Sequence, residues 1–362
     1  MMNVLLIGGT GVIGNSLTER LVGKNINVYV TTRNRSLQSF DNVTFLHGDS
    51  LNTNFIKEVT SALSFDVIID FMVYRTQLFK SLIDIYLGSC KHYIFLSSYR
   101  VYSDSHGEKL TEKSLRILDD NRVGNRYRMS EEYAIKKAKQ EDILFAHAKN
   151  NWTVLRPSII FGINRFQLFC FEANLFMPRI ERNKPVVIPE NIRSIKTTHT
   201  FSDVAAEYIE LLLCKSAAFG EVFNLCGDRY MVWGDILDFY RENFNARFNE
   251  IDYQTFKTLY VNEYQVRYDR MVNRELSNMK LKSLIGYQVL ESNFSDLLMT
   301  SIKRSKNYVF EGGRINGRMD KILSLSMASG SGKIIADLKY FMGYNTFLNS
   351  IYGIINKDSY LK

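Results

Sequence analysis

The sequence predicts an α/β fold in which a doubly wound parallel sheet carries a smaller second lobe. Short apolar runs at 3–7 and 27–31 flank a stretch in which Leu17, Leu21 and Val22 recur at helical spacing. A glycine-rich turn separates the first run from this stretch. Repeated strand and helix units of this length form parallel sheets with right-handed crossovers and helices on both faces.

The alternation continues through the first 157 residues. We expect strands at 43–46, 67–71, 92–97 and 153–157, and helices at 55–63, 78–87 and 130–150. A helix at 203–213 and a strand at 221–225 are expected to return to this domain. The sequence therefore predicts a dinucleotide-binding domain over 1–157, with returning segments at about 198–227.

The sequence pattern changes after residue 157. From 158 to 197 the alternation fades and aromatic, proline and basic residues cluster, so we expect a substrate-binding lobe over 158–311. Residues 312–362 form an apolar, basic tail; ten lysines and arginines stand against four acids from 301 to 362, an excess of +6. We interpret this charge as a solvated surface. Binding of nucleic acid, of anionic lipid or of a phosphorylated substrate is the alternative interpretation. The segment 330–333 (GSGK) lacks the spacing of a phosphate loop, and we expect a flexible turn there.

Composition excludes several classes of protein. A hydrophobic share of 46% and a charged share of 23% are typical of a folded chain. No apolar stretch is long enough to span a bilayer, and residues 1–7 run into a glycine turn instead of a signal-peptide cleavage site, which favours a cytosolic protein. The four cysteines are widely spaced and form no Cys-x-x-Cys pair, so neither a zinc site nor a disulfide framework is expected.

The turn after the first strand has the pattern of a phosphate-binding site. Gly8, Gly11 and Gly14 stand three residues apart, where a side chain would block the turn, the approach of a pyrophosphate or helix packing. The helix that follows begins near Val12 and Ile13, and its N-terminus offers free amides and a partial positive charge to phosphates. This is the arrangement of a Rossmann dinucleotide site.

The choice between NAD and NADP depends on the end of the second strand. An NAD site usually carries an acid about 20 residues after the glycines, where it binds the ribose hydroxyls. Here no acid occurs between 26 and 39, while Arg33 and Arg35 suit a 2′-phosphate. The sequence therefore favours NADP and leaves NAD open. Asp49 is placed either to contact the adenine or to cap its loop.

Several ordered motifs carry a family resemblance over roughly residues 1–300. They are GGTGVIG at 8–14, Ser97-Ser98-Tyr99-Arg100-Val101-Tyr102, Tyr133-Ala134-Ile135-Lys136-Lys137, Leu155-Arg156-Pro157, Phe161-Gly162 and Asp203-Val204-Ala205. In this order they resemble the extended short-chain dehydrogenase/reductase family, whose members include nucleotide-sugar epimerases, dehydratases and reductases. The resemblance implies a nicotinamide cofactor and a nucleotide-sugar substrate.

The resemblance also assigns roles to residues. Tyr133 would be the acid/base, Lys137 would bind the nicotinamide ribose, Ser98 would orient the substrate oxygen, and Pro157 would line the cofactor site. Helical spacing places Tyr133 and Lys137 on one face, and an ammonium near a phenol makes proton exchange feasible near neutral pH. Tyr253 and Lys257 share this spacing, but only Tyr133 stands between the Ser-Ser strand and the Arg-Pro strand.

Departures from the family pattern reduce the number of reactions that we expect the protein to catalyse. The family's 4,6-dehydratases carry Asp-Glu where this chain has Tyr99-Arg100, so we do not expect water elimination. Arg165, Arg179 and Arg193 lie in the expected lobe, either as ligands of a diphosphate or on a solvated surface.

Arg33, which suits the 2′-phosphate of NADP, favours a keto-sugar reductase. A nucleotide-sugar epimerase that retains its cofactor remains an alternative, as does a non-catalytic dinucleotide sensor or RNA-binding protein on the same fold. We expect a homodimer with a nucleotide-sugar substrate and without nucleic acid.

Overall fold

A computed structural model describes residues 1–104, 107–259, 263–287, 289, 292–305, 313–325 and 334–344. The chain forms two compact units, and each draws on separate parts of the sequence. Unit 1 comprises Met1–Arg165, Lys196–Met231 and Val272–Lys303. Unit 2 comprises Phe166–Ile195, Val232–Met271 and the described residues from Arg304 onward. In the described part of the chain no helix is long and apolar enough to cross a membrane.

Unit 1 is built on a seven-stranded sheet in which every recorded strand pair is parallel. Its order, β13-β6-β5-β4-β1-β2-β3, is the doubly wound order in which the chain starts at the centre and winds to both edges. This confirms the predicted fold class. The strands are β1 Met2–Ile7, β2 Ile26–Thr32, β3 Val43–His47, β4 Phe65–Asp70, β5 Cys90–Leu96, β6 Trp152–Pro157 and β13 Glu221–Leu225.

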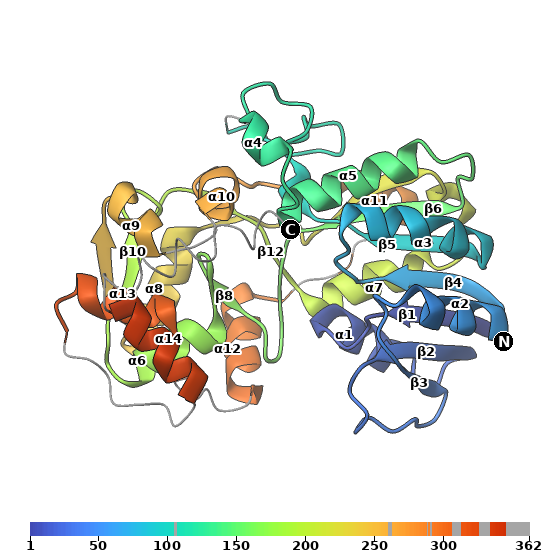
Figure 1. Cartoon of the computed structure of the whole chain (residues 1–362), viewed down its shortest axis with the longest axis horizontal. Coiled ribbons are helices and arrows are strands. Elements are labelled where there is room, and N and C mark those ends of the chain that lie inside the picture. The colour runs from blue at the N-terminus through green and yellow to red at the C-terminus, as the bar shows by residue number, and fades with distance from the viewer. Residues whose placement is uncertain are drawn as a thin grey trace. The chain divides into compact units, whose positions relative to one another are not determined.

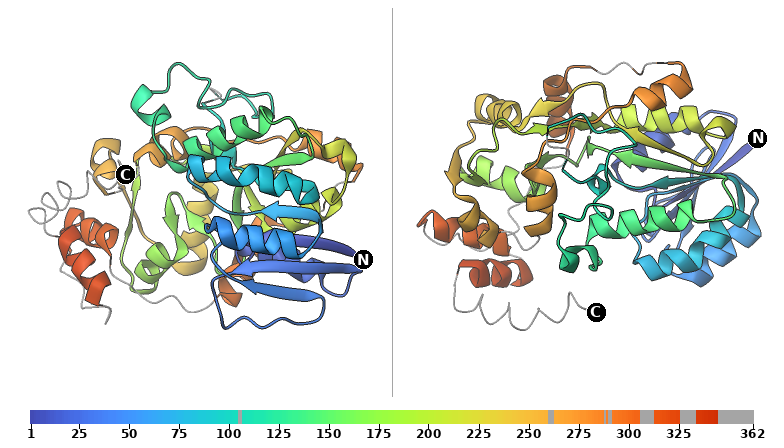
Figure 2. Two further views of the ribbon diagram at one scale, coloured as in Figure 1. Left: turned by 45° about the vertical axis from the view of Figure 1, so that its right-hand side comes forward. Right: turned by 90° about the horizontal axis from the view of Figure 1, so that it is seen from above.

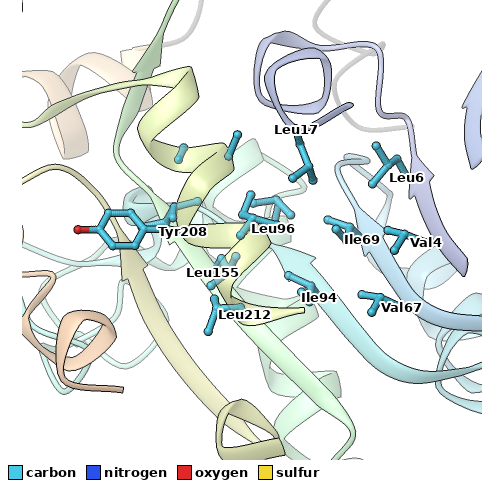
Figure 3. Close-up of a cluster of buried hydrophobic side chains, with 14 of the residues drawn as sticks. Val4, Leu6, Leu17, Val67, Ile69, Ile94, Leu96, Leu155, Tyr208 and Leu212 are labelled. Atoms are coloured by element: carbon cyan, nitrogen blue, oxygen red, sulfur yellow. The ribbon is translucent and has the colours of Figure 1, made fainter. Parts of the chain in front are cut away.

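Helices cover both faces of this sheet (Figures 1 and 2). One face packs against α1 Val12–Leu21, α7 Ser202–Leu212 and α11 Met279–Ile285, and the other against α2 Thr53–Ala62, α3 Thr76–Gly88 and α5 Tyr133–Phe145. Side chains alternate along each strand, so Val4 and Leu6 enter the first core while Leu5 and Ile7 enter the second. Figure 3 shows the first core, where Val67, Ile69, Ile94 and Leu96 continue the row.

Most of the remaining elements of unit 1 are short. These elements are η1 Tyr99–Val101, α4 Asn125–Arg128, β7 Ile159–Phe161, β11 Lys196–Thr197, β12 His199–Phe201, η2 Ser216–Ala218, β14 Met231–Val232 and α12 Phe294–Arg304. The last residue of β14 and the last residue of α12 belong to unit 2. Strands β7 and β12 pair in parallel beside the sheet. This pairing places the Phe161-Gly162 turn next to the start of α7.

Unit 2 contains two small sheets and several helices. Strands β10 Val186–Pro189 and β15 Phe248–Ile251 pair in parallel, and β8 Gln167–Leu168 pairs antiparallel with β9 Phe171–Glu172. Its helices are α6 Ala173–Glu181, α8 Trp233–Phe244, α9 Tyr253–Leu259, α10 Glu263–Gln265, η3 Val266–Arg270, α13 Arg314–Ile322 and α14 Ile334–Tyr344. Aromatic side chains such as Phe169, Phe176 and Trp233 fill its core.

The unit boundaries differ from those expected from the sequence. Residues 272–303, which the sequence placed in the lobe, belong to unit 1, because the Arg274 guanidinium donates to Ser103 O at 2.7 Å and α11 packs against β13. The described parts of the tail form α13 and α14 and belong to unit 2. These helices cross closely, since a Cβ on Gly317 would lie 2.1 Å from Tyr340 O. Residues 330–333 lie outside the described residues.

One histidine in the sheet should contribute to the acid sensitivity of the protein. His92 on β5 is 0% exposed, and burial lowers its pKa to about 4. The hydroxyl of Thr153 donates to Ala218 O at 2.6 Å, so His92 Nε2 donates to Thr153 Oγ1 at 2.8 Å and the ring is neutral. The native pKa lies below that of the unfolded chain, about 6.5. The stability contributed by neutral His92 is therefore present above about pH 6.5 and is lost as the pH falls towards 4.

We predict that His92→Gln loses less stability than the wild type between pH 6.5 and pH 4, by roughly 3 kcal/mol of unfolding free energy. Urea denaturation at a series of pH values measures this difference. The exposed His47 provides a control, since His47→Gln should follow the wild-type curve. Parallel curves for His92→Gln and the wild type would contradict the prediction.

Candidate active site

The turn between β1 and α1 fits a phosphate group. Gly11 is the N-cap of α1, with no side-chain cap and no acid in the first turn, so the amides of Val12, Ile13 and Gly14 are the unpaired donors of a helix start. A Cβ on Gly11 would meet no atom within 4 Å. A Cβ on Gly14 would lie 2.1 Å from Gly9 O, so this glycine is required by packing. The turn therefore offers amides and open space to an anion.

Neighbouring strands hold this turn in place. Gly8 has a φ of +67°, and its amide donates to Thr31 Oγ1 at 2.8 Å, while Thr31 Oγ1 also bonds Ser50 Oγ at 2.7 Å. These contacts join the carboxyl ends of β1, β2 and β3. A Cβ on Gly162 would lie 2.8 Å from Val12 Cγ2, which explains the glycine in the Phe161-Gly162 motif.

Three other residues expected to bind the cofactor lie at or just after the carboxyl ends of strands in the central sheet. Arg33 follows the last residue of β2 and is exposed, and its guanidinium has no recorded partner among the described residues. Asp49 is also exposed, and its Oδ1 accepts from Leu51 N at 3.0 Å, so it caps its loop. Pro157 ends β6 and is half-buried. All three positions are compatible with the cofactor roles expected from the sequence.

Tyr133 is the first residue of α5, and its neighbours fix this helix start. Glu132 is the N-cap and accepts from Ala134 N at 2.8 Å and from the Tyr127 hydroxyl at 3.0 Å. The helix is shorter than the 130–150 expected, because this cap ends the preceding loop and Ala146 is the C-cap. Tyr133 is half-buried.

Arg100 links the serine strand to this helix. Its guanidinium carbon lies 5.2 Å from the centre of the Tyr133 ring, and it donates to Glu132 Oε1 at 2.8 Å. Its backbone amide donates to the Oγ of Ser98 at 3.2 Å, and Ser98 is buried just beyond the end of β5. Arg100 therefore contacts both Ser98 and Tyr133.

Lys137 lies one turn after Tyr133 and is 1% exposed. Its Nζ donates to Met72 O and Leu96 O, both at 2.7 Å, which ties α5 to the carboxyl ends of β4 and β5. Burial lowers the pKa of this ammonium to about 8. The structure thus gathers Ser98, Tyr133 and Lys137 at the carboxyl end of the sheet, where open α/β folds bind their ligands.

One buried ion pair in this region was missed by the sequence analysis. Glu141, one turn after Lys137, is 0% exposed and accepts from Arg156 Nε at 2.9 Å and Nη2 at 2.7 Å. It also accepts from the Ser97 hydroxyl at 2.6 Å. The sequence held a signal for this pair. Glu141 continues the four-residue spacing of Tyr133 and Lys137, and Arg156 belongs to the Leu-Arg-Pro motif at 155–157.

The arginines expected in the lobe have different environments. Arg179 in unit 2 is 0% exposed and pairs with Asp320 at 2.8 Å, and it donates to Pro185 O, so it has a structural role in place of the substrate contact expected. Arg193 pairs with Asp238 at 2.6 Å. Arg165 is exposed, and its backbone closes a turn with Gly162. Tyr253 and Lys257 lie on α9, which belongs to unit 2, whereas Tyr133 and Lys137 belong to unit 1.

Comparison with known proteins shows the family of the chain. A model of the NAD dependent epimerase/dehydratase family matches residues 4–226. The chain belongs to this family. The match covers the seven-stranded sheet together with the Ser98, Tyr133 and Lys137 positions. No curated protein matches the chain.

Several solved structures share the fold at low sequence identity. A dTDP-glucose 4,6-dehydratase from Bacillus anthracis in complex with NAD has a TM-score of 0.65 and 16% identity, over 84% of this chain and 96% of that one. MoeE5 in complex with UDP-glucuronic acid and NAD has a TM-score of 0.62 and 16% identity, over 83% and 98%. A UDP-N-acetylglucosamine 4-epimerase from Bacillus cereus has a TM-score of 0.60 and 15% identity, over 83% and 95%.

Two glycine variants should separate binding from folding in this family member. We predict that Gly14→Ala lowers the unfolding free energy by about 1–3 kcal/mol, because its methyl group would overlap Gly9 O. Gly11→Ala should fold as the wild type does, since its φ of −81° suits alanine and the space is open. It should nevertheless weaken dinucleotide binding by about tenfold or more, because the methyl group would keep the pyrophosphate from the backbone.

Thermal unfolding of both variants measures their stability, and titration with the cofactor measures their dinucleotide affinity. Wild-type affinity in Gly11→Ala would remove this turn from the binding site.

Proposed function

We propose that the protein is an NAD(P)-dependent oxidoreductase that acts on a nucleotide-activated sugar, and specifically a keto-sugar reductase. The observation that carries this proposal is the gathering of Ser98, Tyr133 and Lys137 beside an open glycine turn at one edge of the sheet. A protein that only sensed a dinucleotide would have no need of a tyrosine and a buried lysine beside that turn.

Each residue has a role that its chemistry allows. Gly8, Gly11 and Gly14 would hold the dinucleotide, whose nicotinamide would supply or accept a hydride. Tyr133 exchanges a proton with the substrate oxygen at its phenolic oxygen. Ser98 orients that oxygen by a hydrogen bond. Two of the three N–H groups of Lys137 donate to backbone carbonyls, and the third would donate to a ribose hydroxyl.

The substrate class rests on the solved relatives. Those named above are described with dTDP-glucose, UDP-glucuronic acid and UDP-N-acetylglucosamine, which are all sugars joined to a nucleoside diphosphate. The exposed Arg165 is suited to contact such a diphosphate. These points support a nucleotide sugar as the substrate.

Arg100 and Arg33 favour a reductase within this class. A guanidinium stays protonated, so Arg100 cannot exchange the protons that water elimination requires, and it is already paired with Glu132. The exposed Arg33 suits the 2′-phosphate of NADP, whose reduced form drives reductions. A 4-epimerase is the second candidate, because a 4-epimerase shares the fold and would use the same three residues.

Isotope transfer tests the reaction. Incubation with a keto-sugar nucleotide and NADPH deuterated at nicotinamide C4 should give one deuterium per product and oxidised cofactor in solution. Tyr133→Phe should lower this rate by about 10²- to 10⁴-fold, as expected for loss of a general acid. Tyr253→Phe is the matched control, since its tyrosine has the same spacing to a lysine, and it should keep the wild-type rate.

Inversion of a sugar centre without net oxidation of the cofactor would contradict the reductase assignment and support the epimerase. Wild-type turnover in Tyr133→Phe would remove this tyrosine from the reaction.

Cofactor preference tests Arg33 separately. We predict that Arg33→Asp lowers NADP affinity by roughly one to two decades and reverses the preference over NAD, because one charge-assisted contact is worth about 1.5–3 kcal/mol. Calorimetry with both dinucleotides measures this change. Arg35→Asp should have the smaller effect, and unchanged NADP affinity in Arg33→Asp would reject the assignment.

A further inference from the structure

The ammonium of Lys137 is buried without a carboxylate in hydrogen-bond contact. Its two recorded acceptors are backbone carbonyls, and it lies 4.4 Å from the centre of the Phe95 ring. A buried charge is costly unless an opposite charge compensates it. Burial lowers the pKa of Lys137 to about 8, and the negative charges of Asp70 and Glu141 act in the opposite direction.

Asp70 is a buried carboxylate without a cation in hydrogen-bond contact. It ends β4 and is 0% exposed. Its Oδ1 accepts from Met72 N at 2.9 Å and from the Tyr74 hydroxyl at 3.2 Å, and its Oδ2 accepts from the Tyr93 hydroxyl at 2.7 Å. Burial raises the pKa of Asp70, while the Tyr93 hydrogen bond and the charge of Lys137 lower it.

One residue of the backbone joins these two charges. The amide of Met72 donates to Asp70, and the carbonyl of Met72 accepts from Lys137. The carboxylate therefore fixes the orientation of the segment that binds the ammonium. Tyr74 extends this network, because its hydroxyl also bonds the Tyr86 hydroxyl at 2.9 Å.

The other charges near Lys137 do not compensate it. Glu141 is bound to Arg156 and Arg116, and Lys136 has the same sign as Lys137. Across the part of the chain that the structure describes, Asp70 is the carboxylate acting on Lys137 that has no ion pair of its own.

We propose that Asp70 is a positioning residue for Lys137, which it serves by fixing the Met72 carbonyl and by supplying the buried negative charge that balances the ammonium. The meaning of this role for catalysis rests on the proposed function. At neutral pH it would hold a charged N–H group ready for the ribose of a dinucleotide.

Asp70→Asn removes the charge and keeps the shape. The amide oxygen can still accept from Met72 N and Tyr74, and the amide nitrogen can donate to the Tyr93 oxygen. In protein labelled with ¹³C at lysine Cε, with the Lys137 signal assigned by its absence from Lys137→Met, NMR titration follows Lys137 directly. We predict that its pKa falls from about 8 by about 1–3 pH units in Asp70→Asn.

Asp66→Asn is the matched control. Asp66 lies on the same strand, four residues before Asp70, and pairs with Lys91 at 2.7 Å at the surface. This variant should leave the Lys137 titration unchanged. An unchanged Lys137 titration in folded Asp70→Asn would overturn the proposal.

If Asp70→Asn does not fold, Asp70→Ser decides the question. It also removes the negative charge, and its hydroxyl can still accept from Met72 N, so the pKa of Lys137 should fall in the same direction. No movement of the Lys137 titration in this variant would then overturn the proposal.

Dinucleotide binding adds a functional measurement. At pH 7.5 Asp70→Asn should bind NADPH at least several-fold more weakly than the wild type, and the difference should shrink below the lowered pKa of Lys137. Equal NADPH affinity across this range would overturn the proposed role of Asp70 in presenting the ammonium. A wild-type protein that binds neither NADPH nor NADH would refute the proposed function, while the lysine titration would still decide whether Asp70 balances Lys137.

Discussion

The arrangement of the candidate site depends on the buried ion pair between Glu141 and Arg156. The arginine binds the carboxylate through two nitrogens, so the contact fixes both the distance and the rotation of α5 relative to β6. A shift of α5 by one residue would rotate its side chains by about 100° and carry Tyr133 and Lys137 away from the sheet edge. The same carboxylate accepts from Ser97, next to Ser98, so it also locates the serine strand.

Much of unit 1 could be predicted from the sequence because its signals are local. Short apolar runs marked the strands, and the glycines at 8, 11 and 14 marked the turn. The spacing of Tyr133 and Lys137 could not show that Lys137 would be buried, since burial depends on Leu96 at the end of β5 and on Met72 just after β4. Glu141 was within reach of sequence reasoning, but only a structure could show that it meets Arg156.

Contacts between distant parts of the sequence were beyond prediction for the same reason. Arg179 was read as a possible substrate ligand, yet it pairs with Asp320, far along the chain in the segment read as a tail. The return of 272–303 to unit 1 depends on Arg274 reaching Ser103, which no periodicity encodes. Such pairings are set by the complementary shape and charge of surfaces that form only when the chain has folded.

The discontinuous construction of unit 1 has a consequence for how the chain is made. Strand β13 covers the β6 edge of the sheet, but it is synthesised after residues 166–195, which belong to unit 2. A nascent chain ending near Pro157 therefore presents β6 with unpaired amides and carbonyls, and such an edge pairs readily with other chains. Native unit 1 needs residues as late as 303, so it completes its fold only when most of the protein has left the ribosome. Fragments cut at the apparent end of the dinucleotide domain would expose the same edge permanently.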